Sequence, residues 1–280
     1  MKPKIVRTVA ALRDETAIWR ARGLRYAVVP TMGALHEGHL ALVEEGRRRA
    51  DNVITTIFVN PKQFAAHEDL GRYPRDEAGD LRKLGSAGTD LVFAPAREEI
   101  YPAEFATTIS LCGPAKVGLE DRFRPQFLDG VATVVAKLFI ETGADFAIFG
   151  EKDYQQLKTV SRMARDLDIP VEIVGVPTIR ELDGLAMSSR NAYLTKRERE
   201  KAPAIFQTLS EVAQKIRAGM EPKAAARRAP RSLTALGFKV DYVAVRNATT
   251  LVEPVEIGEP LRLLAAAWLG KTRLIDNVGV

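Results

Sequence analysis

The sequence predicts an α/β protein, in which a parallel sheet covered by helices on both faces precedes a smaller α+β domain. Over about the first 180 residues, short β-branched runs alternate with helical patterns, as in parallel sheets with crossover helices. After Pro177 this alternation stops. The 280 residues suffice for two domains with separate cores. We place these domains at residues 1–178 and 179–280.

The elements of the first domain follow from hydrophobic periodicity and turn residues. Strands are expected at Tyr26–Val29, Val53–Val59, Leu91–Ala94, Thr107–Leu111, Phe146–Phe149 and Val171–Val176. Helices are expected at Leu40–Ala50, Glu77–Leu84 (closed by Gly85), Val131–Glu141 and Tyr154–Leu167. Sheets of this class bind ligands at the carboxyl ends of their strands, near a topological switch point.

The second domain is predicted to open with a long charged helix over Thr195–Ala218. Thr195 is a candidate N-cap, and Glu198 follows at the spacing of a capping box. Two strands are expected after it, at Val240–Val245 and Leu261–Ala267. Helix and strands together indicate a small α+β unit.

Composition excludes several classes of protein. With 46% hydrophobic and 28% charged residues, the chain is globular rather than disordered. Its single cysteine, Cys112, excludes an intrachain disulfide and a cysteine zinc cluster. No uncharged run approaches the ~18 residues that cross a bilayer, and no secretory pattern is present. We therefore expect a soluble, cytoplasmic protein without a membrane partner.

The net charge of +5 comes from 41 Lys+Arg against 36 Asp+Glu. These basic residues are spread along the chain, apart from short clusters at Arg47–Arg49 and Arg227–Arg231. A nucleic-acid footprint is concentrated on one surface, so the pattern favours solvated helix faces and no nucleic-acid partner. Nucleotides and carboxylates remain compatible as small acidic substrates.

The run PTMGALHEGH lies at a predicted strand-to-helix turn. Gly33 and Gly38 allow a sharp turn and close approach of a ligand. His36 and His39 are one helical turn apart at a helix N-terminus, which attracts anions. As imidazolium donors they would stabilise charge on phosphate oxygens, and Thr31 would add a hydroxyl donor. The alternative is a capped helix start with two surface histidines.

A second motif, GEKD, joins the strand that ends near Gly150 to the next helix. Lys152 is an ammonium suited to phosphate, and Asp153 can carry a hydrated Mg²⁺ or cap the helix. Of Gln155 and Gln156, one amide is expected to face the cleft and to bind a small polar substrate. Taken alone, a GEKD sequence is more often a turn with a helix cap.

The third motif is the loop Met187–Asn191, preceded by a hinge at Gly184. Ser188, Ser189 and Arg190 would form a movable clamp for a triphosphate. A polar interdomain linker is the alternative. Its pairing with HxGH favours the clamp, because the pair resembles the two signature motifs of adenylate-forming nucleotidyltransferases.

Other polar residues carry weaker signals. Gln63, in NPKQF at a strand's carboxyl end, can donate and accept hydrogen bonds, although loop punctuation explains this segment as well. Asp76 is expected to cap a helix. We expect Cys112 to be a small core residue and His67 to lie in a surface loop.

Together these segments resemble the pantothenate synthetase (pantoate–β-alanine ligase) family. The likeness runs over nearly the whole chain: PTMGALHEGH, VNPKQF, RYPRD, DLVFAP, GVATVVAKLF, FGEKDYQQL, IVGVPTIRELDGLAMSSRNAYL and AAWLGKTRLIDN. The resemblance implies that ATP and (R)-pantoate form pantoyl adenylate and pyrophosphate with Mg²⁺. β-Alanine then attacks the activated carbonyl, giving pantothenate and AMP. It also implies a cytoplasmic homodimer of a Rossmann-like domain and a smaller lid-like C-terminal domain.

Carried over by position, His39 aligns with the family's proton-donor histidine, and Gln63 and Gln156 align with the glutamines that hold pantoate, Gln63 also lying against β-alanine. Charge neutralisation is expected from His39, Lys152, Ser188, Ser189 and Arg190, and Mg²⁺ binding from Asp153. The implied ATP site comprises Met32, Gly33, Ala34, Leu35, His36, Glu37, Gly38, His39, Gly150, Glu151, Lys152, Asp153, Ile179, Met187, Ser188, Ser189 and Arg190.

One segment departs from the family pattern, which reads close to RPGHF before the GV of GVATVV. Here Gln126 stands at the glycine position and Phe127 at the histidine position, while Arg124 is retained. We expect a different local loop shape and no loss of the ATP motifs.

Three alternatives are weighed against the ligase. A cytidylyl- or adenylyltransferase of the same superfamily shares HxGH but should lack FGEKDYQQL and the C-terminal signature. An aminoacyl-tRNA synthetase disagrees with the chain's size and with the absence of a basic RNA-binding module. A nucleotide-binding regulatory protein without catalysis is suggested only by the altered segment around Gln126 and Phe127.

Overall fold

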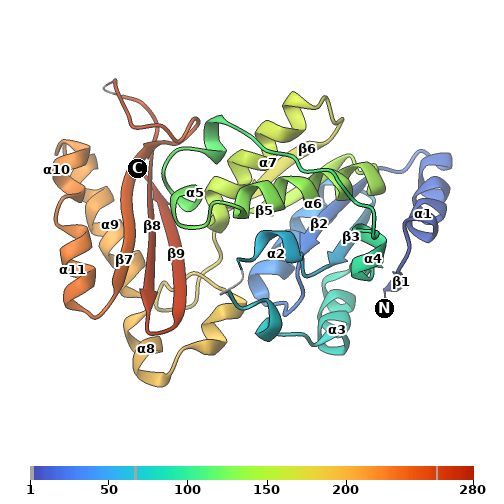
Figure 1. Ribbon diagram of the computed structural model, residues 1–280, viewed down its shortest axis with the longest axis horizontal. Coiled ribbons are helices and arrows are strands. Elements are labelled where there is room, and N and C mark those ends of the chain that lie inside the picture. Colours follow the sequence, from blue (N-terminus) through green and yellow to red (C-terminus); the bar gives the residue numbers. More distant parts are fainter. Residues whose placement is uncertain (1–2, 66–67, 257) are drawn as a thin grey trace.

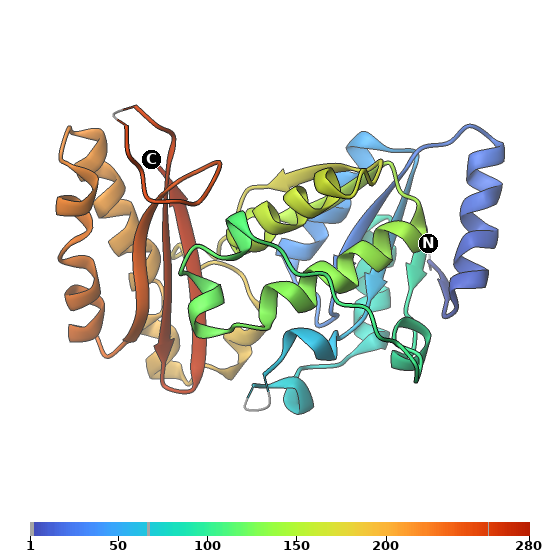
Figure 2. The ribbon, with the colours of Figure 1, turned by 45° about the horizontal axis from the view of Figure 1, so that its top comes forward.

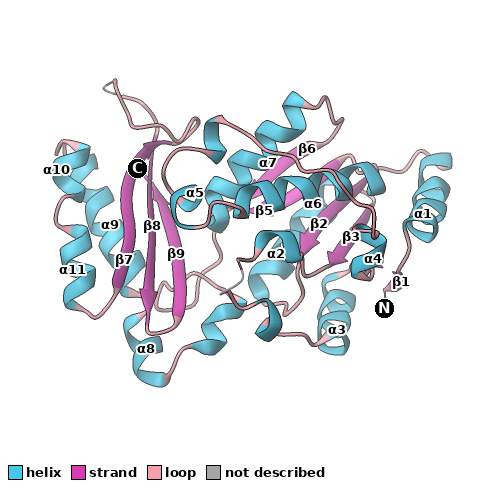
Figure 3. Ribbon diagram, viewed as in Figure 1, coloured by secondary structure: helices cyan, strands magenta, loops and turns pink. Residues whose placement is uncertain are grey.

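Two sheets organise the chain, a six-stranded parallel sheet and a three-stranded antiparallel sheet (Figures 1 and 3). This computed structural model describes residues 3–65, 68–256 and 258–280. The strands are β1 (Lys4–Val6), β2 (Tyr26–Thr31), β3 (Asn52–Ile57), β4 (Leu91–Phe93), β5 (Phe146–Gly150), β6 (Glu172–Val176), β7 (Lys239–Asn247), β8 (Leu261–Leu269) and β9 (Thr272–Gly279). The helices are α1 (Val9–Ala21), α2 (Glu37–Arg49), α3 (Glu77–Ala87), α4 (Arg97–Ile100), α5 (Glu120–Phe123), α6 (Phe127–Thr142), α7 (Tyr154–Asp166), α8 (Lys196–Lys201), α9 (Ala204–Arg217), α10 (Pro222–Ala226) and α11 (Ala229–Ala235). The predicted fold class is confirmed.

Helices cover both faces of the parallel sheet because its buried strands alternate side chains between the two faces. Val28 and Ile54 share one apolar cluster with residues of α1, α6 and α7. Their neighbours Val29 and Val53 belong to another cluster, together with residues of α2 and α3. The sheet is therefore the middle layer of three.

The strand order is β1-β4-β3-β2-β5-β6. The chain moves from β2 toward one edge of the sheet through β3 and β4, and it returns to the other side of β2 with β5 and β6. The point of reversal lies between β2 and β5. Ligands of open parallel sheets bind at this point, outside the carboxyl ends of the strands.

The small sheet packs between two layers, with β8 as its central strand. Leu263 and Ala265 contribute to an apolar cluster with α9, α10 and α11. Ala244 and Leu264 belong instead to the cluster that contains α6 and α7. Figure 2 shows this sheet beside the parallel sheet, with α10 and α11 on its outer side. The predicted boundary at residues 178 and 179 falls between the last strand of one sheet and the first of the other.

Several element predictions are corrected by the structure. The helix α3 continues through Gly85 and ends at Ala87, and the next residue, Gly88, has the left-handed φ of 86° that closes helices. The predicted helix over Thr195–Ala218 is two helices, α8 and α9, because Pro203 lacks the N–H that would continue the first. The predicted capping box of Thr195 and Glu198 is confirmed.

The predicted strand Thr107–Leu111 is wrong. This segment is extended but unpaired in the described structure and runs beside α6, where the Ile109 backbone N–H donates to Thr133 Oγ1 at 2.9 Å. Cys112 is exposed at the end of this segment, so its assignment to the core is also wrong. His67 lies outside the described residues.

Seven of the helices and strands that the structure describes are additional to those predicted: α1, α4, α5, α10, α11, β1 and β9. The pairing of β9 with β8 supplies the third strand of the small sheet. Among the described residues, no helix is long and apolar enough to span a membrane.

Candidate functional site

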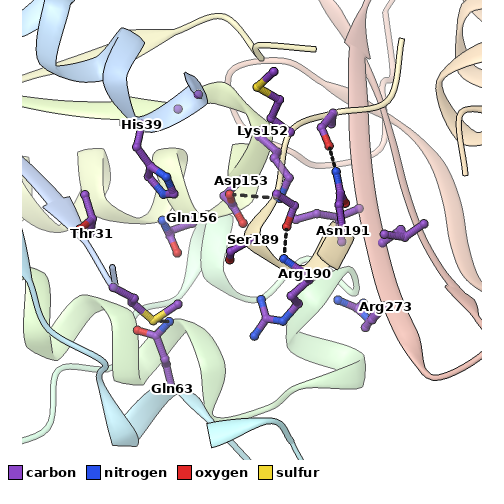
Figure 4. A pocket seen from close by; sticks show the side chains of 18 of the residues that line it. Thr31, His39, Gln63, Lys152, Asp153, Gln156, Ser189, Arg190, Asn191 and Arg273 are labelled. Atoms are coloured by element: carbon purple, nitrogen blue, oxygen red, sulfur yellow. Dashed lines mark hydrogen bonds and ion pairs between the residues drawn. The ribbon is translucent and has the colours of Figure 1, made fainter. Parts of the chain in front are cut away.

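A cavity of about 410 Å³ lies at the carboxyl ends of β2 and β5, and residues of β8 and β9 complete its wall. It brings together the three predicted motifs and Gln63, which are far apart in the sequence (Figure 4). The predicted site residues that line it are Met32, His36, Gly38, His39, Gln63, Gly150, Lys152, Asp153, Gln156, Ile179, Met187, Ser188, Ser189 and Arg190.

The turn after β2 is held by a buried carboxylate. Gly33 and Ala34 both have positive φ, 81° and 52°. Asp80, which is 2% exposed, accepts hydrogen bonds from the backbone N–H groups of Ala34 and Leu35 at 2.9 and 2.8 Å. These bonds offset the cost of the left-handed conformation at a residue with a Cβ. Asp80 therefore sets the path of the backbone into α2.

Thr31 does not supply the free hydroxyl donor that the sequence suggested. Its Oγ1 donates to the Thr56 carbonyl at 2.6 Å and accepts from the Gly33 N–H at 3.2 Å. The hydroxyl proton is therefore used between β2 and β3, and Thr31 stabilises the turn.

The rings of His36 and His39 lie against each other at the start of α2, with centroids 4.1 Å apart and planes tilted by 40°. Burial, together with the charge of Lys152, lowers the pKa of His36 to about 4. Burial and the neighbouring His36 lower the pKa of His39 well below its usual value. Both histidines are accordingly neutral near pH 7, which corrects the expectation of imidazolium donors.

The tautomer of His39 follows from its one internal hydrogen bond. The backbone N–H of His36 donates to His39 Nδ1 at 3.3 Å. Since Nδ1 accepts, the proton of the neutral ring is on Nε2. Figure 4 shows the ring on the cavity wall near Gln156. His39 thus presents a neutral N–H donor, and the buried Nδ1 of His36 has no partner among the described residues.

The turn after β5 carries a lysine and a carboxylate into the cavity. Lys152 Nζ lies 3.8 Å from Asp153 Oδ2. Asp153 makes no side-chain capping bond to α7, so its carboxylate is left for the cavity. On α7, Gln155 is buried and its amide is used by Glu120, Pro114 and Asp121, whereas Gln156 lines the cavity.

The loop that contains Ser188, Ser189 and Arg190 is tied across the cavity to the segment after Gln63. The guanidinium of Arg190 pairs with both oxygens of Asp69, at 3.0 and 2.9 Å. Burial raises the pKa of Asp69, but the hydrogen bonds from Arg190 lower it. The pKa of Asp69 is therefore below its usual value. Ser189 Oγ lies 3.1 Å from Tyr73 Oη. In this structure, two side chains of the predicted clamp, Ser189 and Arg190, are therefore bonded to other protein side chains.

Gln63 is oriented by a buried neighbour. Asn60, which is 1% exposed, donates from Nδ2 to Gln63 Oε1 at 3.0 Å. Among the residues that the structure describes, the amide nitrogen of Gln63 has only Met32 Sδ as a partner, at 3.3 Å. Gln63 therefore offers a donor to the cavity. The altered segment forms the start of α6, where the Arg124 guanidinium stacks on the Phe127 ring at 3.8 Å.

Five predicted nucleotide-site residues do not line the cavity: Gly33, Ala34, Leu35, Glu37 and Glu151. The first three form the turn held by Asp80, and Glu151 pairs with Arg262 of β8 at 3.0 Å. Conversely, the cavity includes residues that the sequence did not suggest, among them Asp69, Trp268 and Arg273. RYPRD and AAWLGKTRLIDN were the nearest signals, since they adjoin or contain these residues.

The described residues form no group of three or more His, Cys, Asp or Glu side chains that could hold a metal ion. Asp153 lines the cavity 3.8 Å from Lys152, whereas each of the other carboxylates of the lining pairs with an arginine, namely Glu68, Asp69, Asp241 and Asp276. One carboxylate agrees with the usual binding of Mg²⁺, which retains waters and takes further oxygens from substrate phosphates. The residues present therefore fit Mg²⁺ only together with a nucleotide.

Comparisons with known proteins agree on one family. A family model described as pantoate-beta-alanine ligase matches residues 4–279. The chain is 56% identical to a pantothenate synthetase from Caulobacter vibrioides, over 99% of both chains. It is similar to the crystal structure of pantothenate synthetase from Thermus thermophilus, with a TM-score of 0.91, 45% identity and 98% coverage of both chains. It is also similar to a pantoate-beta-alanine ligase from Francisella tularensis in complex with beta-gamma ATP and beta-alanine. That match has a TM-score of 0.83 and 30% identity and covers 99% of this chain and 97% of the other.

Proposed function

Because the chain belongs to the pantoate–β-alanine ligase family, we propose that its cavity carries out the two steps of that ligase with the residues described above. ATP and pantoate give pantoyl adenylate and pyrophosphate, and β-alanine then gives pantothenate and AMP. The observation that supports this assignment most is the meeting of the HxGH turn, Lys152 and the loop Ser188–Arg190 at the switch point of the sheet.

In the first step, a pantoate carboxylate oxygen attacks the α-phosphorus of ATP and pyrophosphate leaves. No proton must be removed from the carboxylate, so positioning and charge stabilisation dominate. Neutral His39 carries its proton on Nε2 and would donate it in a hydrogen bond to an α-phosphate oxygen. Lys152 and Arg190 supply positive charge along the phosphates, with hydroxyl donors from Ser188 and Ser189.

The nucleotide also needs a concave surface of small residues and backbone groups. Gly38 leaves space beside the His36 ring, and Met32, Met187 and Ile179 provide apolar contact area. The remaining residues of the implied ATP site would act by shaping the turns after β2 and β5 and not through side-chain contacts with the nucleotide. They are Gly33, Ala34, Leu35, Glu37, Gly150 and Glu151.

Gln63 and Gln156 are our candidates for holding pantoate, with Gln63 also against β-alanine. The donor that Asn60 leaves available on Gln63 suits a carboxylate or hydroxyl oxygen. In the second step, the amine nitrogen of β-alanine attacks the acyl carbonyl, AMP leaves and a proton is released. Holding both small substrates beside the adenylate raises their effective concentration.

Asp153 is our candidate Mg²⁺ residue, acting with phosphate oxygens and waters. When bound there, Mg²⁺ would neutralise phosphate charge. Removal of Mg²⁺ by a chelator is expected to stop exchange, and its return to restore it.

Pantoate-dependent exchange between ATP and labelled pyrophosphate tests the proposed site, followed by AMP release that depends on β-alanine. Both activities are expected. ATP binding without pantoate-dependent exchange would instead indicate a nucleotide-binding regulatory protein. A cytoplasmic homodimer is proposed on the family resemblance alone, and sedimentation at several concentrations tests the dimer.

A further inference from the structure

The C-terminal signature AAWLGKTRLIDN ends in two buried residues, Asp276 and Asn277, that the proposed chemistry does not use. They are 4% and 3% exposed and lie next to each other on β9. Neighbouring strand residues direct their side chains to opposite sides. Each of the two reaches a different segment of the cavity, so β9 contacts both phosphate-facing segments at once.

Asn277 holds the turn that carries Lys152. Its Nδ2 donates to the backbone carbonyls of Glu151 and Lys152, both at 2.9 Å. Its Oδ1 accepts from Arg262 Nε at 2.6 Å, which fixes the orientation of the amide. Arg262 also pairs with the Glu151 carboxylate at 3.0 Å. The turn after β5 is thereby bonded to the small sheet through two backbone carbonyls and through the Glu151 side chain.

Asp276 holds the segment that leads to Ser188. Its carboxylate pairs with both terminal nitrogens of Arg180, at 2.6 and 2.8 Å. Arg180 donates in turn to the Gly184 carbonyl at 2.9 Å and stacks on Phe206 at 3.8 Å. These contacts fix the hairpin that precedes Met187.

We propose that Asn277 is a positioning residue for Lys152 and that Asp276–Asn277 set the separation of the two phosphate-binding segments in the adenylation step. Asn277 is absent from the cavity lining, so it acts through the turn and not on substrate. The proposal rests on the assignment of the cavity to ATP and pantoate. A displacement of the order of 1 Å at a reacting group lowers rates by ~10²-fold, so two hydrogen bonds at this turn are enough to matter.

The variant Asn277→Asp tests this because it keeps the size of the side chain and the acceptor for Arg262. It removes the two donors, places an oxygen against the two carbonyls and adds a negative charge, which the control variant below also adds. We expect pantoate-dependent exchange to fall about 10–100-fold and the KM for ATP to rise. The KM for pantoate should stay unchanged.

Asn247→Asp is the matched control. Asn247 is an asparagine of the same sheet whose amide donates to Glu259 at 2.6 Å, and it does not line the cavity. Its variant should exchange at the wild-type rate. Thermal melting of both variants identifies any loss of folded protein.

A double-mutant cycle separates positioning from general destabilisation. If Asn277 acts through Lys152, then Asn277→Asp should have little further effect on exchange in a Lys152→Ala enzyme. An equal fold loss in both backgrounds would overturn the proposal, as would wild-type exchange by Asn277→Asp. Should Asn277→Asp fail to fold, Arg262→Gln takes its place, with an expected loss of about 3–10-fold and the same dependence on Lys152.

Calorimetric binding of a non-hydrolysable ATP analogue keeps the two proposals distinguishable. Wild-type protein without pantoate-dependent exchange would overturn the assigned reaction. Even then, weaker analogue binding by Asn277→Asp than by Asn247→Asp would support the positioning role, and equal binding would overturn it.

Discussion

His39 shows how the surroundings of one side chain decide its chemistry. HxGH fixes two imidazoles at the start of a helix, yet burial and nearby lysines keep both neutral near pH 7. The hydrogen bond from the His36 backbone to Nδ1 leaves the proton on Nε2 of His39. A neutral donor with a fixed tautomer suits the proposed hydrogen bond to a phosphate oxygen, because its protonation state does not have to change first.

Replacing His39 by Ala is therefore expected to lower pantoate-dependent ATP–pyrophosphate exchange by ~10²-fold or more, as for loss of an oxyanion donor. The measurement is the exchange rate at saturating ATP and pantoate. Turnover near that of the wild type would refute the role of His39.

The Gln156 amide leads to a prediction about substrate selectivity. Gln156 lines the cavity, while Gln155 beside it is buried in other contacts. Gln156→Ala is expected to raise the KM for pantoate several-fold more than the KM for ATP. An unchanged pantoate KM would remove Gln156 from the substrate site.

The lowered pKa of His36 predicts an acid dependence of stability. In the unfolded chain this histidine takes up a proton near pH 6.5, whereas in the folded protein it does so only near pH 4. Between these values the unfolded state binds more protons, so stability is full above about pH 6.5 and falls as the pH is lowered toward 4. As the pH is lowered across this window, the thermal unfolding midpoint should fall less for His36→Gln than for the wild type. Identical pH slopes for the two proteins would contradict the assignment.

At the scale of elements, the strand-to-helix turn after β2 depends on two glycines for different reasons. Gly33 adopts a φ of 81°, which favours glycine. Gly38 has an ordinary helical position, but a Cβ there would lie 2.9 Å from Cε1 and Nδ1 of His36. The helix therefore starts without a side chain at the point where the His36 ring folds over it.

The variant Gly38→Ala is expected to displace the His36 ring and to lower exchange roughly 10-fold or more. The thermal unfolding midpoint should change little, since Ala is a better helix former than Gly. Gly71→Ala is the control because nothing lies within 4 Å of its added Cβ. Equal exchange by the two variants would argue against a need for the His36 ring position.

At the scale of the whole molecule, a buried charge network joins the small sheet to α5, which directly precedes α6. Arg273 of β9 pairs with Glu120 of α5 at 2.7 Å and with Asp241 of β7 at 2.8 Å. Tyr242 donates to Glu120 at 2.9 Å. Burial raises the pKa of Glu120, but the positive charge of Arg273 lowers it. The pKa of Glu120 is therefore below its usual value. The stability contributed by Glu120 is therefore present above about pH 4.5 and lost below it.

Arg273→Met is expected to lower the free energy of unfolding by about 3–5 kcal/mol, because it removes the arginine that pairs with buried Asp241 and leaves Glu120 with the longer pair to Arg124 at 3.6 Å. Urea unfolding at pH 7 measures this difference. Arg162→Met removes an exposed pair with Asp166 on α7 and should leave the unfolding midpoint unchanged. A similar small effect at Arg273 would show that the network contributes little.

The sequence by itself determined the alternation of strands and helices in the first domain, and with it the position of the candidate site. The turn residues around Gly33 and Gly150 mark the ends of β2 and β5, and local periodicity is enough to find such ends. Predictions of individual helices and strands failed where the local sequence signal is ambiguous. Gly85 is tolerated inside a helix, and the extended residues 107–111 bond to α6 without joining a sheet.

Only the tertiary structure decided how the motifs act on one another. Asn277 meets Lys152 and Arg190 meets Asp69 across more than a hundred residues of chain. The neutrality of His39 likewise depends on burial among side chains brought together by folding. Hydrogen bonds, ion pairs and desolvation act through space over a few ångströms, and spacing along the sequence does not specify those distances.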